Sequence, residues 1–292
     1  MDIFVRASEF GIETGFFDAL GVWRGADPAV LAAVIEAVGE SGPAEPLPGR
    51  DVEPAFPGAF DRVWVLAVQL YSLRSPDNWG IGDFSDLRRL IAWAADEGAA
   101  GIGLNPLHAL FEDRSADCSP YAPSSRLFLN TLYIDVAALP ELPRDFLHDR
   151  ADALARLRES ETIAYADVAA LKRDALHAAF AVFRRAPHPD RLAAFQRFRS
   201  DRGVPLARFA AFNVLRRLYA RPWWEWPAEW RRPDDARIAA LRAGEQGEAM
   251  EAIEFAQWCA HEQLFACGKL AAELGQPLGL YLDLAVGVRP DG

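Results

Sequence analysis

Cysteine and histidine, the residues most often used to bind metals or form disulfides, show spacing that supports neither role. The three cysteines, Cys118, Cys259 and Cys267, include no C-x-x-C pair. Cys259 and Cys267 fall in a helical pattern in which two turns would separate them by ~12 Å, too far for a disulfide. The five histidines have no metal-ligand spacing. The sequence therefore predicts reduced thiols, no metal and no cofactor, as is typical of a cytoplasmic protein.

Ligand binding is expected in a long turn-rich segment at residues 105–130, which contains Ser119, Pro120 and Tyr121. The segment follows an apolar run at 99–104 that is typical of a buried strand, and α/β proteins bind ligands at the carboxyl ends of parallel strands. A loop of this length in a compact domain is more often functional than not. Taken alone, however, the Ser-Pro-Tyr residues favour turn chemistry over binding.

Three apolar runs are expected to form the strands that position this loop, at 63–71, 99–104 and 277–286. Each is apolar enough to be covered on both faces. Asp283 ends the third run. A helix capped by Asp83 is expected between the first two runs, with its apolar face at Leu87, Leu90, Ile91 and Ala94. A right-handed crossover makes these two strands parallel.

The rest of the chain is expected to be largely helical. A short β-like piece is expected at Leu132 to Val136, and further helices near 168–183, 190–202, 206–219 and 252–274. A helix from Pro28 to Val38, capped by Asp27, is the clearest element of the N-terminal part. The expected regions are an N-terminal helical segment at 1–42, a Pro-rich linker at 43–60, an α/β region at 61–140, an inserted helical subdomain at 141–250, and a helix with the third strand at 251–292.

Charge and hydropathy exclude several classes of partner. The formal net charge is −11, which disfavours nucleic acids and anionic lipid surfaces. No apolar run approaches the ~20 residues that a membrane span requires. The first ten residues carry charges among the apolar ones, unlike a secretory signal peptide. Neutral ligands such as sugars are compatible with this charge.

Four ordered blocks resemble the amylomaltase, or 4-α-glucanotransferase, family. They are VQLYSLRSPDNWGIGDF at 68–84, GLNPLHA at 103–109, CSPYAPSSRLFLNTLYIDV at 118–136 and GLYLDLAVGV at 279–288. The resemblance implies an α/β fold, the first three β/α units of a TIM-type (β/α)8 barrel with the helical subdomain inserted. It also implies an enzyme that transfers segments of α-1,4-glucans and maltooligosaccharides.

The resemblance assigns sugar contacts to four residues and catalysis to none. Ser119 and Tyr121 match residues that line the donor sugar sites, where a tyrosine ring can stack on a pyranose. Asp283 matches an acidic residue near the cleaved bond. Trp79 is expected beside it, at the mouth of the barrel. Alternatives stay open: Asp83 is better explained as a helix cap than as a ligand, and Trp79 can simply cover the end of the barrel.

The carboxylates that the family uses for catalysis have no counterpart in this sequence. The family's nucleophilic Asp lies on strand four in an Arg-x-Asp pattern, and its acid/base Glu and third Asp lie on later strands. Arg199-Ser200-Asp201 is similar in letters but falls in an expected helix. The resemblance thus implies an incomplete barrel and an inactive N-terminal fragment, with a missing C-terminal barrel segment as a partner. Alone, such a fragment is expected to expose apolar edges and to be poorly soluble, oligomeric or chaperone-bound.

Two further interpretations remain open. A non-catalytic α-glucan-binding protein would keep the mouth of the barrel without transferring sugars. The tryptophans at 223, 224, 226 and 230 could stack on sugars, although a helix-packing cluster is favoured. His108 and His261 are interpreted as ordinary hydrogen-bonded residues, and Cys118 has no identifiable activating base.

Overall fold

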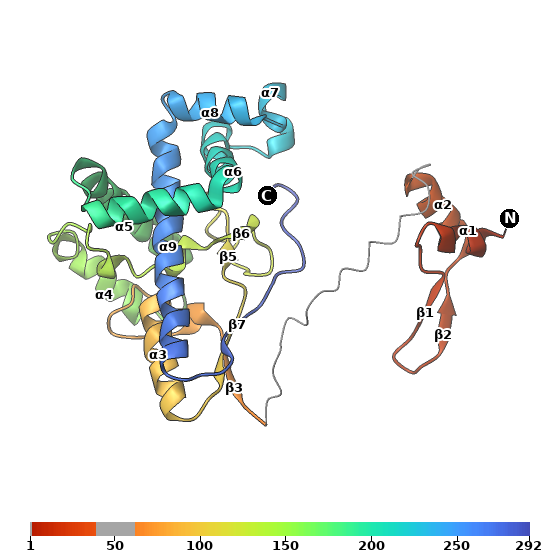
Figure 1. The fold of residues 1–292 in the computed structure, drawn as a ribbon, viewed down its shortest axis with the longest axis horizontal. Coiled ribbons are helices and arrows are strands. Elements are labelled where there is room, and N and C mark those ends of the chain that lie inside the picture. Colours follow the sequence, from red (N-terminus) through yellow and green to blue (C-terminus); the bar gives the residue numbers. More distant parts are fainter. Residues whose placement is uncertain (1, 39–61) are drawn as a thin grey trace. The chain divides into compact units, whose positions relative to one another are not determined.

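The computed structural model describes residues 2–38 and 62–292. The chain divides into two compact units, residues 1–61 and 62–292 (Figure 1). The predicted linker at 43–60 lies outside the described residues. Each unit is considered by itself.

The N-terminal unit contains two helices and a hairpin. Helix α1 spans Ile3–Glu9 and α2 spans Pro28–Val38, the latter with the predicted bounds. The Ala29 amide donates to the Asp27 side chain at 2.7 Å, as expected for its cap. Strands β1 (Gly15–Phe17) and β2 (Trp23–Gly25) pair antiparallel. The segment predicted to be helical thus also contains a hairpin, because the Asp18 side chain accepts from the Leu20 and Val22 amides and closes a turn between two short strands.

The larger unit is built on a parallel sheet of three strands, β3 (Val65–Val68), β4 (Gly101–Leu104) and β7 (Gly279–Leu282), in the order β3-β4-β7. All pairings in this sheet are parallel, as predicted. The outer strands are shorter than the predicted runs. After Val68 the chain enters a 3₁₀ turn at Leu70–Ser72, whose Leu70 amide donates to the Asn105 side chain. A Cβ on Gly101 would lie 2.3 Å from the Gly279 carbonyl oxygen, so glycine permits the close pairing of β4 and β7.

Helix α3 (Phe84–Asp96) connects β3 to β4 and begins with the predicted cap. Asp83 Oδ1 accepts from the Ser85 and Asp86 amides at 2.9 and 3.1 Å, while the Asp86 side chain accepts from the Asp83 amide. Asn78 donates to the same Asp86 carboxylate at 2.7 Å. The residues of the NWGIGDF block are therefore buried parts of the turn that starts α3.

A second, antiparallel pair of strands follows β4: β5 (His108–Ala109) and β6 (Ser125–Leu129). The predicted strand at 132–136 is wrong, because this segment forms 3₁₀ turns at Thr131–Tyr133 and Val136–Ala138. Side chains form hydrogen bonds with the backbone groups of this segment. Asn130 accepts from the Leu132 amide, Lys172 Nζ donates to the Leu132 and Ile134 carbonyls at 2.7 Å, and Gln263 accepts from the Asp135 amide.

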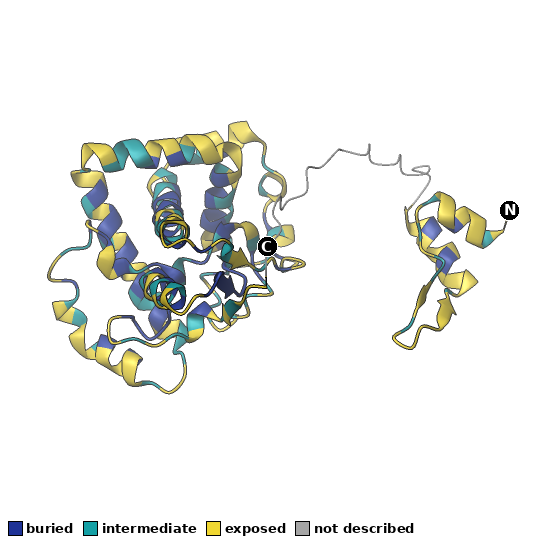
Figure 2. Ribbon diagram, turned by 60° about the horizontal axis from the view of Figure 1, so that its bottom comes forward, coloured by how far each residue is buried: buried dark blue, intermediate teal, exposed yellow. Residues whose placement is uncertain are grey.

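Six further helices are present in residues 62–292, in the predicted helical region and after it. They are α4 (Ala151–Glu159), α5 (Tyr165–Arg185), α6 (Pro189–Tyr219), α7 (Ala228–Arg231), α8 (Asp235–Ala243) and α9 (Gly247–Glu273). The two helices predicted at 190–202 and 206–219 join as α6, with a kink at Gly203, whose backbone is non-helical, and with Pro205 inside the helix. One apolar core includes residues of the sheet and of α3, α5, α6 and α9, and the buried faces of these helices point inward (Figure 2).

Several apolar side chains on and after β7 are exposed. Tyr281, Leu282, Leu284, Val286 and Val288 all belong to this group, and Val63 and Trp64 before β3 are exposed as well. The apolar exposure expected near the outer strands is therefore present. Poor solubility or association remains a prediction.

The burial of Asp83 leads to a pH prediction for stability. Burial raises the pKa of Asp83 to about 6 from an ordinary value of 3.8, although Lys172 opposes the shift. Between these values the folded state holds a proton that the unfolded state releases, so this group's contribution to stability falls as pH rises from about 4 to about 6. The loss is at most ~3 kcal/mol.

The substitution Asp83→Asn tests this effect, because asparagine also caps helices and remains neutral. We expect the variant to be ~1–3 kcal/mol more stable than the parent chain above pH 6 and equally stable at pH 4. Urea unfolding at several pH values measures the difference. The exposed Asp96→Asn serves as control. A difference between Asp83→Asn and the parent that does not change with pH would contradict the assignment.

Candidate functional site

Tyr121 and Asp283 lie together at the carboxyl edge of the parallel sheet. Asp283 directly follows β7, and its amide donates to the Leu104 carbonyl at the end of β4, at 3.2 Å. The Tyr121 side chain is 60% exposed. The pKa of Tyr121 is raised, chiefly by the Asp283 carboxylate close to its hydroxyl group. The structure thus brings together two of the predicted sugar-binding residues, which are 162 positions apart in the sequence, and leaves the tyrosine ring accessible.

His108 and Arg126 hold the segment that follows Asp283. The Ala285 amide donates to His108 Nε2 at 3.3 Å, and Arg126 donates to the Ala285 and Val286 carbonyls at 3.1 and 3.0 Å. Burial lowers the pKa of His108, and Arg126 lowers it further, which favours the neutral imidazole that can accept this bond. The hydrogen-bonded interpretation of His108 is confirmed. Sequence reasoning gave Arg126 no role, because nothing near residue 126 indicates a partner at 285.

Ion pairs tie the last residues of the chain to the same loop. Arg289 donates to Asp117 at 2.5 Å, and its amide donates to the Pro123 carbonyl. Asp291 pairs with Arg114 and, at 3.4 Å, with the buried Arg216. The loop around Tyr121 and the segment after β7 therefore form one connected wall.

The other two residues predicted to contact sugars, Ser119 and Trp79, do not lie beside Asp283 with an exposed ring as Tyr121 does. Ser119 is exposed and its carbonyl accepts from the Ala122 amide in a turn that precedes β6. Trp79 is only 2% exposed, and its ring stacks on Phe146 with centroids 6.3 Å apart. Trp79 is thus a buried core residue in the described part of the chain, which agrees with the alternative that it covers the end of the barrel. Its contact with a sugar stays a prediction.

The tryptophan cluster divides into packing and exposed residues. Trp226 is 2% exposed, contacts the rings of Phe212 and Tyr219, and donates from Nε1 to the Arg221 carbonyl. The favoured packing interpretation is therefore confirmed for Trp226. Trp224 is 44% exposed and lies edge-on to Trp223.

The cysteines are reduced as predicted, whereas His261 differs from its predicted hydrogen-bonded arrangement. All three cysteines are free, and burial raises the pKa of Cys259 and of Cys267, the latter to about 12. His261 stacks near Phe198 and Phe265, and within residues 62–292 its Nδ1 has no hydrogen-bond partner, unlike the expected arrangement. Within the described ranges, no cluster of three or more His, Cys, Asp or Glu side chains could hold a metal ion. None of the described helices has the length and apolarity to span a bilayer.

The fold and the site define an α/β protein that carries an accessible aromatic ring beside a carboxylate at the carboxyl edge of a parallel sheet. Comparison with known proteins narrows this class. The family model described as 4-alpha-glucanotransferase matches residues 68–292, and the chain belongs to this family.

Relatives and solved structures agree with this assignment. The 4-alpha-glucanotransferase of Haemophilus influenzae is 38% identical over 77% of this chain and 35% of its own length. That of Mycobacterium tuberculosis is 36% identical over 92% of this chain and 37% of its own length. The crystal structure of amylomaltase from Corynebacterium glutamicum superposes with a TM-score of 0.64 and 33% identity, covering 79% of this chain and 31% of that one. The chain thus spans little more than a third of the length of these two curated relatives.

Proposed function

We propose that residues 62–292 form the first three β/α units of a (β/α)8 barrel and supply the sugar-binding wall of a 4-α-glucanotransferase acting on α-1,4-glucans. The parallel order β3-β4-β7 follows the order of the strands in the chain, as in such a barrel. The exposed apolar residues of β7 and of the segment after it are those that further strands would cover.

The pairing of Tyr121 with Asp283 is the observation that carries the proposal. The exposed ring offers an apolar face for a pyranose, and the carboxylate beside it can accept hydrogen bonds from sugar hydroxyls. The amylomaltase of Streptococcus agalactiae, 20% identical with a TM-score of 0.65, shares the fold and was solved in complex with acarbose. A protein with this fold therefore binds a sugar-type ligand.

Transfer itself is proposed for the whole barrel. Retaining transfer needs one carboxyl group to attack the anomeric carbon and another, about 5–5.5 Å away, to protonate the leaving oxygen. Asp283 is proposed to bind sugar hydroxyls beside that pair, with the pair supplied by other strands. We expect residues 1–292 alone to release no glucose from maltotriose. Release that is lost in Asp283→Asn would instead assign catalysis to this wall.

Binding of maltoheptaose tests the role of Tyr121. Tyr121→Ala removes the stacking ring, and we expect at least a ~10-fold loss of affinity in calorimetric titration. Tyr121→Phe keeps the ring and loses only the hydroxyl, so its affinity should fall less. Trp93→Ala is the matched control, because it removes an exposed aromatic ring from α3, away from the proposed sugar site. Equal losses in Tyr121→Ala and Trp93→Ala would contradict the proposed site.

A further inference from the structure

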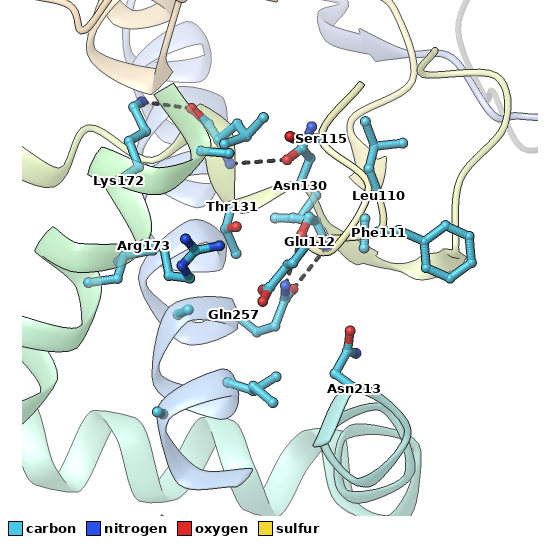
Figure 3. Close-up of a pocket in the computed structure, with 18 of the residues that line it drawn as sticks. Leu110, Phe111, Glu112, Ser115, Asn130, Thr131, Lys172, Arg173, Asn213 and Gln257 are labelled. Atoms are coloured by element: carbon cyan, nitrogen blue, oxygen red, sulfur yellow. Dashed lines mark hydrogen bonds between the residues drawn. The ribbon is translucent and has the colours of Figure 1, made fainter. Parts of the chain in front are cut away.

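A pocket lies on the side of the loop formed by residues 109–118, between that loop and helices α5, α6 and α9 (Figure 3). Its cavity volume is about 70 Å³, and the wider empty space around it, including the part open to solvent, is about 900 Å³. Its lining includes neither Tyr121 nor Asp283, so it is separate from the proposed sugar site. Most of its interior is apolar, with Phe111, Leu129, Leu176, Phe209, Ile253 and Ala256 among the lining residues.

One buried polar group faces this apolar interior. Asn213 on α6 is buried, and its Nδ2 donates to the Phe209 carbonyl at 2.9 Å. Its side-chain oxygen points into the pocket (Figure 3) and accepts no hydrogen bond from the described part of the chain. Gln257, by contrast, is fully engaged, because it donates to the Leu129 carbonyl and accepts from the Leu129 amide. Asn213 therefore offers an acceptor to an occupant.

Basic groups gather at the mouth of the pocket. Arg173 and His177 are exposed one turn apart on the same face of α5, and Arg217 comes from α6. Burial lowers the pKa of His177, and the nearby Arg217 and Arg173 guanidinium groups lower it further. Two acidic residues of the facing loop also line the pocket, Glu112 and Asp117. Glu112 is already paired with Arg217, and Asp117 is paired with Arg289. Within residues 62–292 no ion pair engages Arg173, so its charge is free for a ligand.

The apolar interior and the arginine at the mouth together indicate which class of ligand the pocket can bind. A sugar would leave most of its hydroxyl groups unpaired against this lining, at a cost for each. An inorganic anion would leave the apolar interior unfilled. We propose that the pocket binds a small organic acid, with an apolar body against Leu176, Phe209 and Ile253 and its anionic group at Arg173. The proposal does not depend on the glucanotransferase function.

Two probes of equal shape test the proposal: 4-phenylbutyrate and its neutral amide, 4-phenylbutanamide, titrated into the 292-residue chain by ligand-observed NMR. The acid should bind more tightly than the amide. Arg173→Gln should lower the affinity for the acid ~10-fold, which corresponds to the loss of one charge-assisted hydrogen bond, and leave the affinity for the amide unchanged. Arg185→Gln, an exposed arginine farther along α5 that does not line the pocket, is the control and should change neither.

A second variant locates the binding site. Ala256→Phe places a ring inside the pocket and should abolish binding of both probes, with circular dichroism showing that the variant is folded. If Ala256→Phe does not fold, the comparison of acid binding by the parent chain and by Arg173→Gln still tests the proposal, because Arg173 lies at the surface. Equal affinity of acid and amide, unchanged binding in both variants, or no binding of the acid at about 10 mM would overturn the proposal.

Discussion

Replacing Lys172 with methionine is expected to lower the free energy of unfolding of this unit by about 3–5 kcal/mol. The chain contains only two lysines, and Lys172 is 1% exposed. Its Nζ donates to the carbonyls of Leu132 and Ile134 at 2.7 Å. Methionine fills a similar volume without a donor, so both carbonyl oxygens would remain buried and unpaired.

The acidic groups near Lys172 enlarge the expected effect. Burial lowers the pKa of Lys172, while Asp83, Asp135 and Asp86 raise it, in that order of importance. Without the ammonium group, these carboxylates lose their compensating charge in a poorly solvated region. The loss should therefore exceed that of a neutral hydrogen-bond donor, which is about 1 kcal/mol.

Urea unfolding of Lys172→Met measures the effect, with Lys269→Met as the matched control. Lys269 is exposed and, within residues 62–292, pairs with Glu273 alone, four residues later, at 3.5 Å. Its replacement should therefore change stability by less than ~0.5 kcal/mol. Similar stabilities of the two variants would show that Lys172 does not hold the 131–135 segment as described.

Replacing Glu254 with glutamine is expected to cost about 2–4 kcal/mol. Glu254 on α9 is 1% exposed and joins three helices through two arginines. Arg199 on α6 approaches Glu254 Oε2 at 2.9 Å, and Arg242, just before the end of α8, binds both carboxylate oxygens. Glutamine keeps the shape of the side chain but leaves two guanidinium groups without their shared counter-charge. The arginines are partly solvated, so the cost should be lower than for a fully buried ion pair.

Glu251→Gln is the control for this network. Glu251 also lies on α9 but stands farther from its arginines, 3.6 Å from Arg184 and 3.8 Å from Arg199. Its replacement should cost less than ~1 kcal/mol. Adding Arg242→Gln to Glu254→Gln should cost little more than Glu254→Gln alone, because one unpaired charge is removed with it. Fully additive losses in a double-mutant cycle would contradict a shared network.

The elements with strong local signals were predicted well. Asp27 and Asp83 precede regular apolar patterns, and each caps its helix where the sequence indicated. The two apolar runs around α3 form parallel strands, since a strand–helix–strand unit is almost always right-handed. The hairpin at 15–25 was missed, because three-residue strands are too short to show an alternating pattern.

The segment at 132–136 shows why a correct apolar pattern can still predict the wrong element. Its β-branched and aromatic residues favour a strand. Its backbone, however, is engaged by the side chains of Asn130, Lys172 and Gln263. Lys172 lies 40 and 38 positions from the two carbonyls that it binds, and Gln263 lies 128 positions from the amide that it binds. No local signal carries that information.

By itself, the sequence determined the parallel α/β core, the helical region after it and the resemblance to the glucanotransferase family, because these depend on local periodicity, caps and ordered blocks. Only the tertiary structure decided which residues of those blocks face solvent. Trp79 and Asp83 are buried in the turn that starts α3, whereas Tyr121 stands open beside Asp283. The physical reason is that burial, and the proximity of residues far apart in the chain, arise from how elements pack against one another.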